Sequence, residues 1–233
     1  MKNKKSINPK AAITFLLMAA SIICLALEIF HTRLNGSERY RFLVWNLFLA
    51  WIPFCAALLA NLASKNKVTL LVFMPMCTLI WLVFFPNAPY LLTDFQHLTV
   101  IDTNAPVWLD VIMMIWFAWT GLMLGISSLY LIQSIVTRQL NAFWGWLFAI
   151  GITTLSSLGV YLGRFMRWNS WDLLDEPKSI VKDIYEIMSD PSGNKLTYLF
   201  VILFTFLFLF IYASIHVIAF ALKDDAIKKQ SHP

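Results

Sequence analysis

Six apolar stretches separated by short polar connections dominate the sequence. Each is about 18–27 residues long, which is enough for an α-helix to cross a hydrocarbon core ~30 Å thick. They are Ala11–Phe30, Phe42–Ala63, Val68–Phe85, Val107–Gln133, Phe143–Gly163 and Leu196–Leu222. The pattern predicts an all-α integral membrane protein, a bundle of about six transmembrane helices. Its parts would be a basic N-terminus (1–10), a single polytopic transmembrane domain (11–222) and a charged tail (223–233).

Two further helices are expected outside the six spans. Asn87-Ala-Pro89 follows span three directly, and Asn with a nearby Pro is typical of a helix start. It predicts a helix of about ten residues that is re-entrant or interfacial. Before span six, Pro177–Met188 has one apolar stripe and predicts an interfacial helix. The members of that stripe are Ile180, Val181, Ile184, Ile187 and Met188.

Composition supports a membrane protein and argues against nucleic-acid binding. Hydrophobic residues make up 59% of the chain and charged residues 13%, whereas a soluble domain has about 25% charged residues. The formal net charge of +5 comes largely from the termini. Basic residues beside membrane spans are expected for orientation and for contact with anionic lipid. Membrane lipid is therefore the expected partner, and no motif identifies a cofactor or a protein partner.

The connection between spans three and four sets the expected orientation. It runs from Pro86 to Pro106 without any Lys or Arg, which favours the outer side of a bacterial cytoplasmic membrane. Both termini are then cytoplasmic. The connection between spans five and six lies two spans further on, so it is expected on the same face.

These two connections carry most of the candidate chemistry. In the first, Asp94 and His97 are three residues apart and would share a helix face. They could act as an acid–base pair, or as metal ligands together with a further carboxylate. Asp110 falls in the first turns of span four, where a carboxylate favours the positive end of the helix dipole. Asn87 and Tyr90 are added as candidate ligand contacts.

The second connection offers two arginines. If helix five continued past Gly163, Arg164, Arg167, Trp168 and Trp171 would form one stripe. Two guanidinium groups on one face suit a phosphate or a carboxylate, and the tryptophans would suit a lipid chain. Asn169 would join the ligand contacts and Asp172 the catalytic groups. An equally simple alternative is that the arginines pair with Asp94, Asp110 or Asp172 and hold the two connections together.

The same two stretches resemble a known family, the bacterial multi-pass membrane proteins of domain of unknown function 1361. The matching residues are Phe85-Pro-Asn-Ala-Pro-Tyr-Leu-Leu-Thr-Asp-Phe-Gln-His-Leu98, Trp108-Leu-Asp110 and Gly163-Arg-Phe-Met-Arg-Trp-Asn-Ser-Trp-Asp172. The resemblance implies a bacterial cytoplasmic-membrane protein with several helices. It implies no activity, so no residue takes a catalytic role from it.

Three functions follow as hypotheses. The first is a membrane-embedded enzyme or binding protein with an outer-face site for an anionic, possibly lipid-linked, ligand. The second is a transporter or a subunit of one, which would need polar residues through the bundle. The third is a scaffold subunit of a membrane complex. Within the spans, Gly121 and Gly125 are spaced for close helix packing rather than for chemistry.

Overall fold

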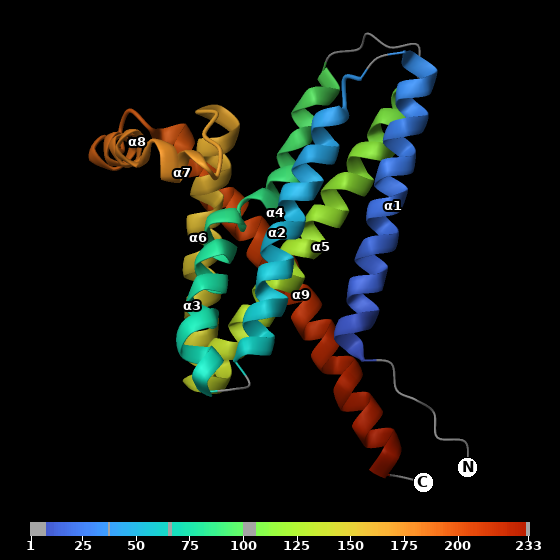
Figure 1. Cartoon of the computed structure of the whole chain (residues 1–233), viewed down its shortest axis with the longest axis vertical. Helices are drawn as coiled ribbons and strands as arrows, with labels where there is room; N and C mark the ends of the chain where they lie inside the picture. The colour runs from blue at the N-terminus through green and yellow to red at the C-terminus, as the bar shows by residue number, and fades with distance from the viewer. Residues whose placement is uncertain (1–7, 37, 65–66, 100–105, 232–233) are drawn as a thin grey trace. The chain divides into compact units, whose positions relative to one another are not determined.

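The computed structural model describes residues 8–36, 38–64, 67–99 and 106–231. All regular secondary structure in these residues is helical, and 6 of the helical segments are long and apolar enough to cross a membrane (Figure 1). They are Pro9–Leu34, Arg41–Ala63, Phe73–Leu98, Val107–Gln139, Ala142–Phe165 and Lys195–Leu222. The prediction of an all-α membrane protein with six spans is confirmed. Predictions that fall on residues 1–7, 100–105 and 232–233 lie outside the described residues.

The chain divides into two compact units, Met1–Ile135 and Val136–Pro233. The first contains α1 (Pro9–Asn35), α2 (Arg41–Ala63), α3 (Lys67–Phe84), α4 (Asn87–Tyr90), the 3₁₀ helix η1 (Leu91–Thr99) and most of α5 (Val107–Gln139). The second contains α6 (Ala142–Phe165), α7 (Asp172–Asp175), α8 (Pro177–Ser189) and α9 (Lys195–Ser231). The expectation of a single transmembrane domain stays a prediction.

Polar side chains link neighbouring helices of the first unit along their length. Lys10 Nζ on α1 donates to Asn61 Oδ1 on α2, and Trp51 Nε1 on α2 donates to Ser21 Oγ on α1 at 3.0 Å. Residue numbers rise along one helix as they fall along the other, so α1 and α2 are antiparallel (Figure 1). Hydrogen bonds of this kind between membrane helices are worth about 0.6 kcal/mol on average.

The third span is broken. Its first part, α3, ends at Phe84, because Pro86 lacks an N–H to continue the helix and disfavours helical backbone in the residue before it. Asn87 does not cap the next helix as expected; its Nδ2 instead donates back to the carbonyl oxygen of Phe84 at 3.1 Å. The short helix expected after span three is present in two consecutive segments, because after α4 the chain continues as the nine-residue 3₁₀ helix η1. In Figure 1 the chain steps sideways at α4 between α3 and η1.

A glycine on α5 makes room for this break. A Cβ atom at Gly121 would lie 2.7 Å from the carbonyl oxygen of Ala88 in α4 and 3.1 Å from the Cβ of Leu91. Such distances are far inside van der Waals contact, so the backbone of α4 reaches α5 only because residue 121 has no side chain. The packing role predicted for Gly121 is confirmed.

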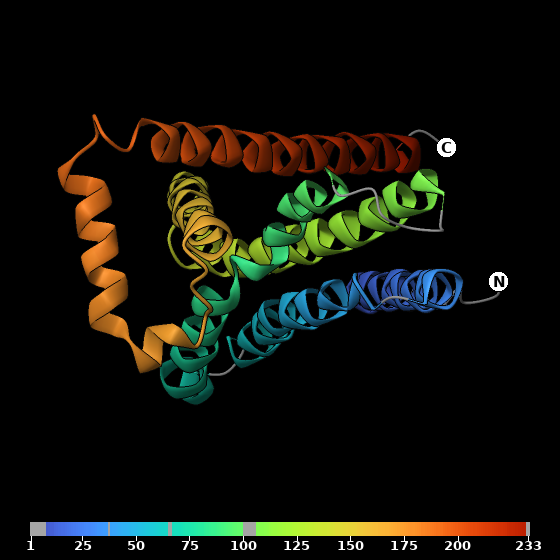
Figure 2. The same cartoon turned by 90° about the horizontal axis from the view of Figure 1, so that it is seen from above.

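In the second unit, α8 lies crosswise to α9 (Figures 1 and 2). Ile180 and Ile187 of α8 are buried and pack with Leu162 of α6, which confirms the predicted helix and its apolar face. The buried stripe is narrower than expected, because Val181 and Met188 are 61% and 67% exposed. These two side chains lie on the neighbouring side of the helix, toward its surroundings.

Candidate functional site

A buried polar cluster joins α1 to α5 in the first unit. Asp110 lies in the first turn of α5, as expected, and its Oδ1 is 2.6 Å from Nε2 of His31 on α1. The hydroxyl group of Tyr40, just before α2, donates to the other oxygen, Oδ2, at 3.3 Å. His31, Tyr40 and Asp110 are only 0%, 1% and 6% exposed. We call these three residues the His31–Tyr40–Asp110 cluster.

The short contact in this cluster joins two buried polar groups. A carboxylate oxygen and a ring nitrogen 2.6 Å apart repel each other unless one of them carries the hydrogen. The Tyr40 hydroxyl supplies the second polar contact of this carboxyl group. Burial, and after it the charge of Asp110, raises the pKa of Tyr40 above its ordinary value. Tyr40 therefore keeps its proton as a donor.

The broken span brings Asp94 and His97 against α2. Asp94 is 1% exposed, and its Oδ2 accepts a hydrogen bond from Nδ2 of Asn46 at 3.3 Å. The His97 ring lies 4.7 Å from the Phe42 ring, and its carbonyl oxygen accepts from Arg39 at 3.3 Å. Both side chains thus contact the same side of α2, in agreement with the expected shared face.

The metal site predicted from Asp94, His97 and a further carboxylate stays a prediction. Among the described residues no group of three or more His, Cys, Asp and Glu side chains is arranged to hold a metal ion. The backbone carbonyl of Tyr90 accepts a hydrogen bond from the Thr93 hydroxyl at 2.7 Å, which ties α4 to η1. The Asp94 and His97 side chains remain as candidate acid–base groups.

The arginine stretch of the second unit is arranged differently from the expected helical stripe. Helix α6 ends at Phe165, and Arg167 has a φ of +64°, in the left-handed region. The expected stripe is therefore wrong, because Arg167 and the tryptophans that follow are not on α6. Trp168 N–H donates back to the carbonyl oxygen of Leu162 at 3.2 Å and closes the helix end. The left-handed position that Arg167 occupies after the helix end is usually taken by glycine, because a side chain in this conformation costs about 1–2 kcal/mol.

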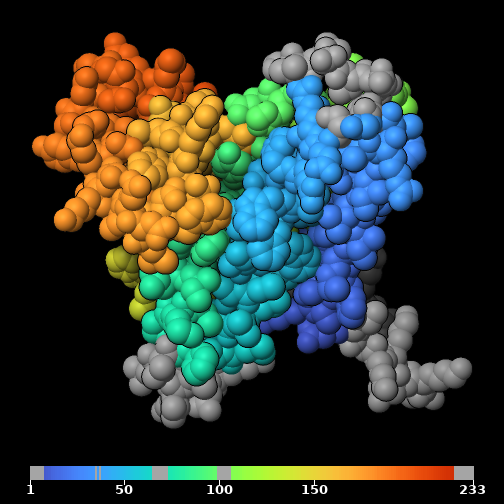
Figure 3. Space-filling view, turned by 45° about the horizontal axis from the view of Figure 1, so that its top comes forward, coloured from blue at the N-terminus to red at the C-terminus, as the bar shows by residue number. Residues whose placement is uncertain are grey.

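Side-chain hydrogen bonds fix the turn that holds Arg167. Nε1 of Trp168 donates to Oδ2 of Asp183 on α8 at 2.7 Å. Oδ2 of Asp172 accepts from the backbone N–H of Asn169 at 2.6 Å and from its side-chain Nδ2 at 3.1 Å. Asp172 and Asn169 thus shape the turn. In Figure 3 the end of α6, α7 and α8 form one surface lobe of this unit.

Exposure separates the remaining candidates. The Arg167 side chain is exposed and, within the described part of the chain, has no hydrogen bond or ion pair. Arg164, in the last turn of α6, is half-buried and does have an interaction partner. Trp171 precedes α7 and is 38% exposed. Arg167 is thus the cation of this stretch that is available to a ligand.

The structure assigns the predicted site residues to two units. Asp94, His97 and Asp110 belong to the first, and the residues from Arg164 to Asp172 belong to the second. That the two stretches meet stays a prediction. The residues missed from the sequence are the partners His31, Tyr40, Asn46 and Asp183. The ionisable His31 close to the end of span one was a signal, but nothing in the sequence said which carboxylate it contacts.

A comparison with protein-family models matches residues 45–211 to a family described as a protein of unknown function, DUF1361. This range covers more than half of the chain and includes both polar stretches. A search of curated proteins and a search of solved structures each gave no match. With its six apolar helices and this match, the chain belongs to the family of domain of unknown function 1361.

Proposed function

We propose that the protein is a membrane-embedded binding protein or enzyme that handles an anionic, lipid-linked ligand at the outer face of a bacterial cytoplasmic membrane. The observation that carries the proposal is Arg167. It is an exposed guanidinium group, without a partner among the described residues, held in a backbone conformation that disfavours any residue with a side chain. Strain of this kind concentrates at functional positions, where another property of the residue compensates for it.

The surroundings of Arg167 suit a ligand with a charged and an apolar part. A planar guanidinium group binds phosphate or carboxylate through two parallel hydrogen bonds. The next residue, Trp168, is held by Asp183 and packs against the apolar cluster of α6 and α8. Tryptophan is enriched where a membrane meets water, which supports a headgroup site at this turn.

Replacing Arg167 by glycine tests this proposal. Glycine adopts a positive φ without strain, so Arg167→Gly should raise the stability of the second unit by about 1 kcal/mol. It should also reduce the retention of phosphatidylglycerol by roughly tenfold, because a charge-assisted hydrogen bond is worth about 1.5–3 kcal/mol. Thermal unfolding in detergent and native mass spectrometry of the lipid-bound protein measure the two effects.

The matched control is Lys178→Gln, which removes another exposed cation from the same unit. It should leave phosphatidylglycerol retention unchanged. Equal losses in the two variants would mean that the lipid responds only to surface charge, and the site would be excluded. A drop in stability in Arg167→Gly would show that Arg167 serves the fold.

A transporter is the second candidate, favoured by the broken third span. Interrupted helices inside a membrane bundle commonly line substrate or ion sites, and the break precedes the buried carboxylate of Asp94. Proteoliposomes loaded with a pH-sensitive dye would then show proton flux under an imposed pH gradient. Asp94→Asn should remove this flux. If the wild-type protein gives no flux above that of empty vesicles, proton transport is excluded.

A further inference from the structure

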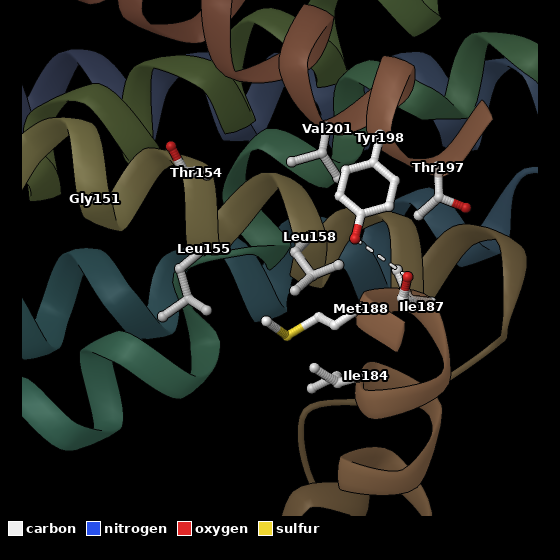
Figure 4. Close-up of a pocket in the computed structure, with 10 residues that line it drawn as sticks. All are labelled: Gly151, Thr154, Leu155, Leu158, Ile184, Ile187, Met188, Thr197, Tyr198 and Val201. Atoms are coloured by element: carbon white, nitrogen blue, oxygen red, sulfur yellow. Dashed lines mark hydrogen bonds between the residues drawn. The ribbon is translucent and has the colours of Figure 1, made fainter. Parts of the chain in front are cut away.

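An open apolar groove runs between α6, α8 and α9 of the second unit (Figure 4). Its volume is about 350 Å³, which is within the ~300–1,000 Å³ range of small-molecule sites. Leu155 and Leu158 of α6, Ile184 of α8 and Val201 of α9 are among its walls. Both α6 and α9 are long and apolar enough to cross a membrane, so lipid chains are expected beside this groove.

Two of the three polar side chains that line the groove are already hydrogen-bonded within the protein. The Thr154 hydroxyl donates to the carbonyl oxygen of Ile150 at 2.9 Å, within α6. The Tyr198 hydroxyl of α9 donates to the carbonyl oxygen of Ile187 on α8 at 3.2 Å, as drawn in Figure 4. A polar molecule in the groove would lose its hydrogen bonds to water and gain few in return. The groove therefore fits an apolar occupant.

Gly151 is a second, independent observation that supports an open groove. It lies inside α6, where glycine costs roughly 0.5–1 kcal/mol relative to alanine. A Cβ atom at this position would meet no atom within 4 Å, so helix packing does not require the glycine. Gly121 is the contrast, because its missing side chain is filled by the backbone of α4. The missing side chain at residue 151 instead widens the groove.

We propose that this groove binds one hydrocarbon chain of a membrane lipid, the apolar part of the ligand whose anion Arg167 holds. The inference rests on the proposed function and names the class of ligand as a phospholipid. Continuity between the two parts supports it. Trp168, next to Arg167, packs in the same apolar cluster as Leu158, Ile184 and Tyr198 of the groove. A lipid with its chain in the groove can thus present its phosphate to the turn.

Photolabelling of the full chain tests the groove. The protein is reconstituted into vesicles of phosphatidylcholine and phosphatidylglycerol that contain a phosphatidylglycerol with a diazirine halfway along one acyl chain. After irradiation, adducts should map to Leu155, Leu158 and Met188. Gly151→Phe fills the groove and should lower their yield at least about tenfold, the factor for losing the burial of two methylene groups.

Ile150→Phe is the matched control, because Ile150 precedes Gly151 on the same helix and is 46% exposed. It should leave the adducts unchanged. Gly151→Ala should unfold no more easily than the wild-type protein, which separates groove filling from damage to α6. A thermal midpoint of Gly151→Phe near that of the wild type shows that any loss of labelling reflects the filled groove.

The outcomes separate this inference from the proposed function. Adducts spread along α9 and insensitive to Gly151→Phe would overturn the groove, while Arg167-dependent lipid retention would keep the function. The absence of lipid adducts at Leu155, Leu158 and Met188 in the wild-type protein would also overturn it. Phosphatidylcholine and phosphatidylglycerol probes could label the groove equally, with no change in Arg167→Gly. That result would support the groove as the site of an acyl chain and would overturn Arg167 as the site of the anion.

Discussion

Replacing His31 by leucine is expected to destabilise the first unit by about 1–3 kcal/mol, the usual cost of leaving a buried polar group without its partner. The His31 and Asp110 side chains are 1% and 8% exposed, so water cannot take the place of the imidazole. The variant leaves the carboxylate with Tyr40 as its remaining donor. Equilibrium unfolding in detergent micelles, followed by circular dichroism, measures the change.

A double-mutant cycle separates the His31–Asp110 contact from the loss of either side chain. Asp110→Leu alone should also be strongly destabilising. The double variant His31→Leu/Asp110→Leu removes both sides of the contact and leaves the Tyr40 hydroxyl without its acceptor, which costs about 1–3 kcal/mol. Its loss should therefore be well below the sum of the single losses. Additive losses would show that the two side chains do not act as a pair.

Ser21→Ala provides the scale for an ordinary polar contact in the same unit. It removes the neutral hydrogen bond from Trp51 and should cost about 0.6 kcal/mol. If His31→Leu costs no more than Ser21→Ala, the short His31–Asp110 contact is not a charged interaction. The comparison uses the same helix and the same measurement.

The six spans could be predicted because the bilayer imposes a length and a composition on each of them. Helix α8 could also be predicted, since Ile180, Ile184 and Ile187 repeat with the period of one helix face. Signals of this kind depend on many residues, so no single contact decides them. The predicted buried face of α8 is wider than the observed one, because Val181 and Met188 are exposed although they are as apolar as their buried neighbours.

The site could be predicted less well because its geometry depends on single local events. The residues after Gly163 contain no helix-stop signal that predicts the end of α6 at Phe165, since Met166, Arg167 and Trp168 are all acceptable in a helix. The positive φ falls on Arg167 although the sequence offers no glycine there. Likewise, Asp110 could have paired with any cation on its side of the membrane. Tertiary packing, which brings α1 beside α5, selects His31.

Gly121→Ala is expected to destabilise the first unit by about 1–3 kcal/mol, the usual effect of adding a methyl group to a filled core. The new Cβ would lie 2.7 Å from the carbonyl oxygen of Ala88. A backbone atom cannot rotate away as a side chain can, so α4 would have to move from α5. That movement would shift η1 and with it Asp94, so a change in proton flux should accompany the loss. Unfolding in detergent measures the stability.

The matched control is Gly151→Ala, in which the same methyl group is added to another membrane helix. Nothing lies within 4 Å of its position, so the helix gains about 0.5–1 kcal/mol from the better helix former. The two substitutions are chemically identical and share the same intrinsic preference for alanine. Opposite signs would therefore isolate the contact between α4 and α5 as the cause. If Gly121→Ala also stabilises the protein, the break in the third span is not held against α5.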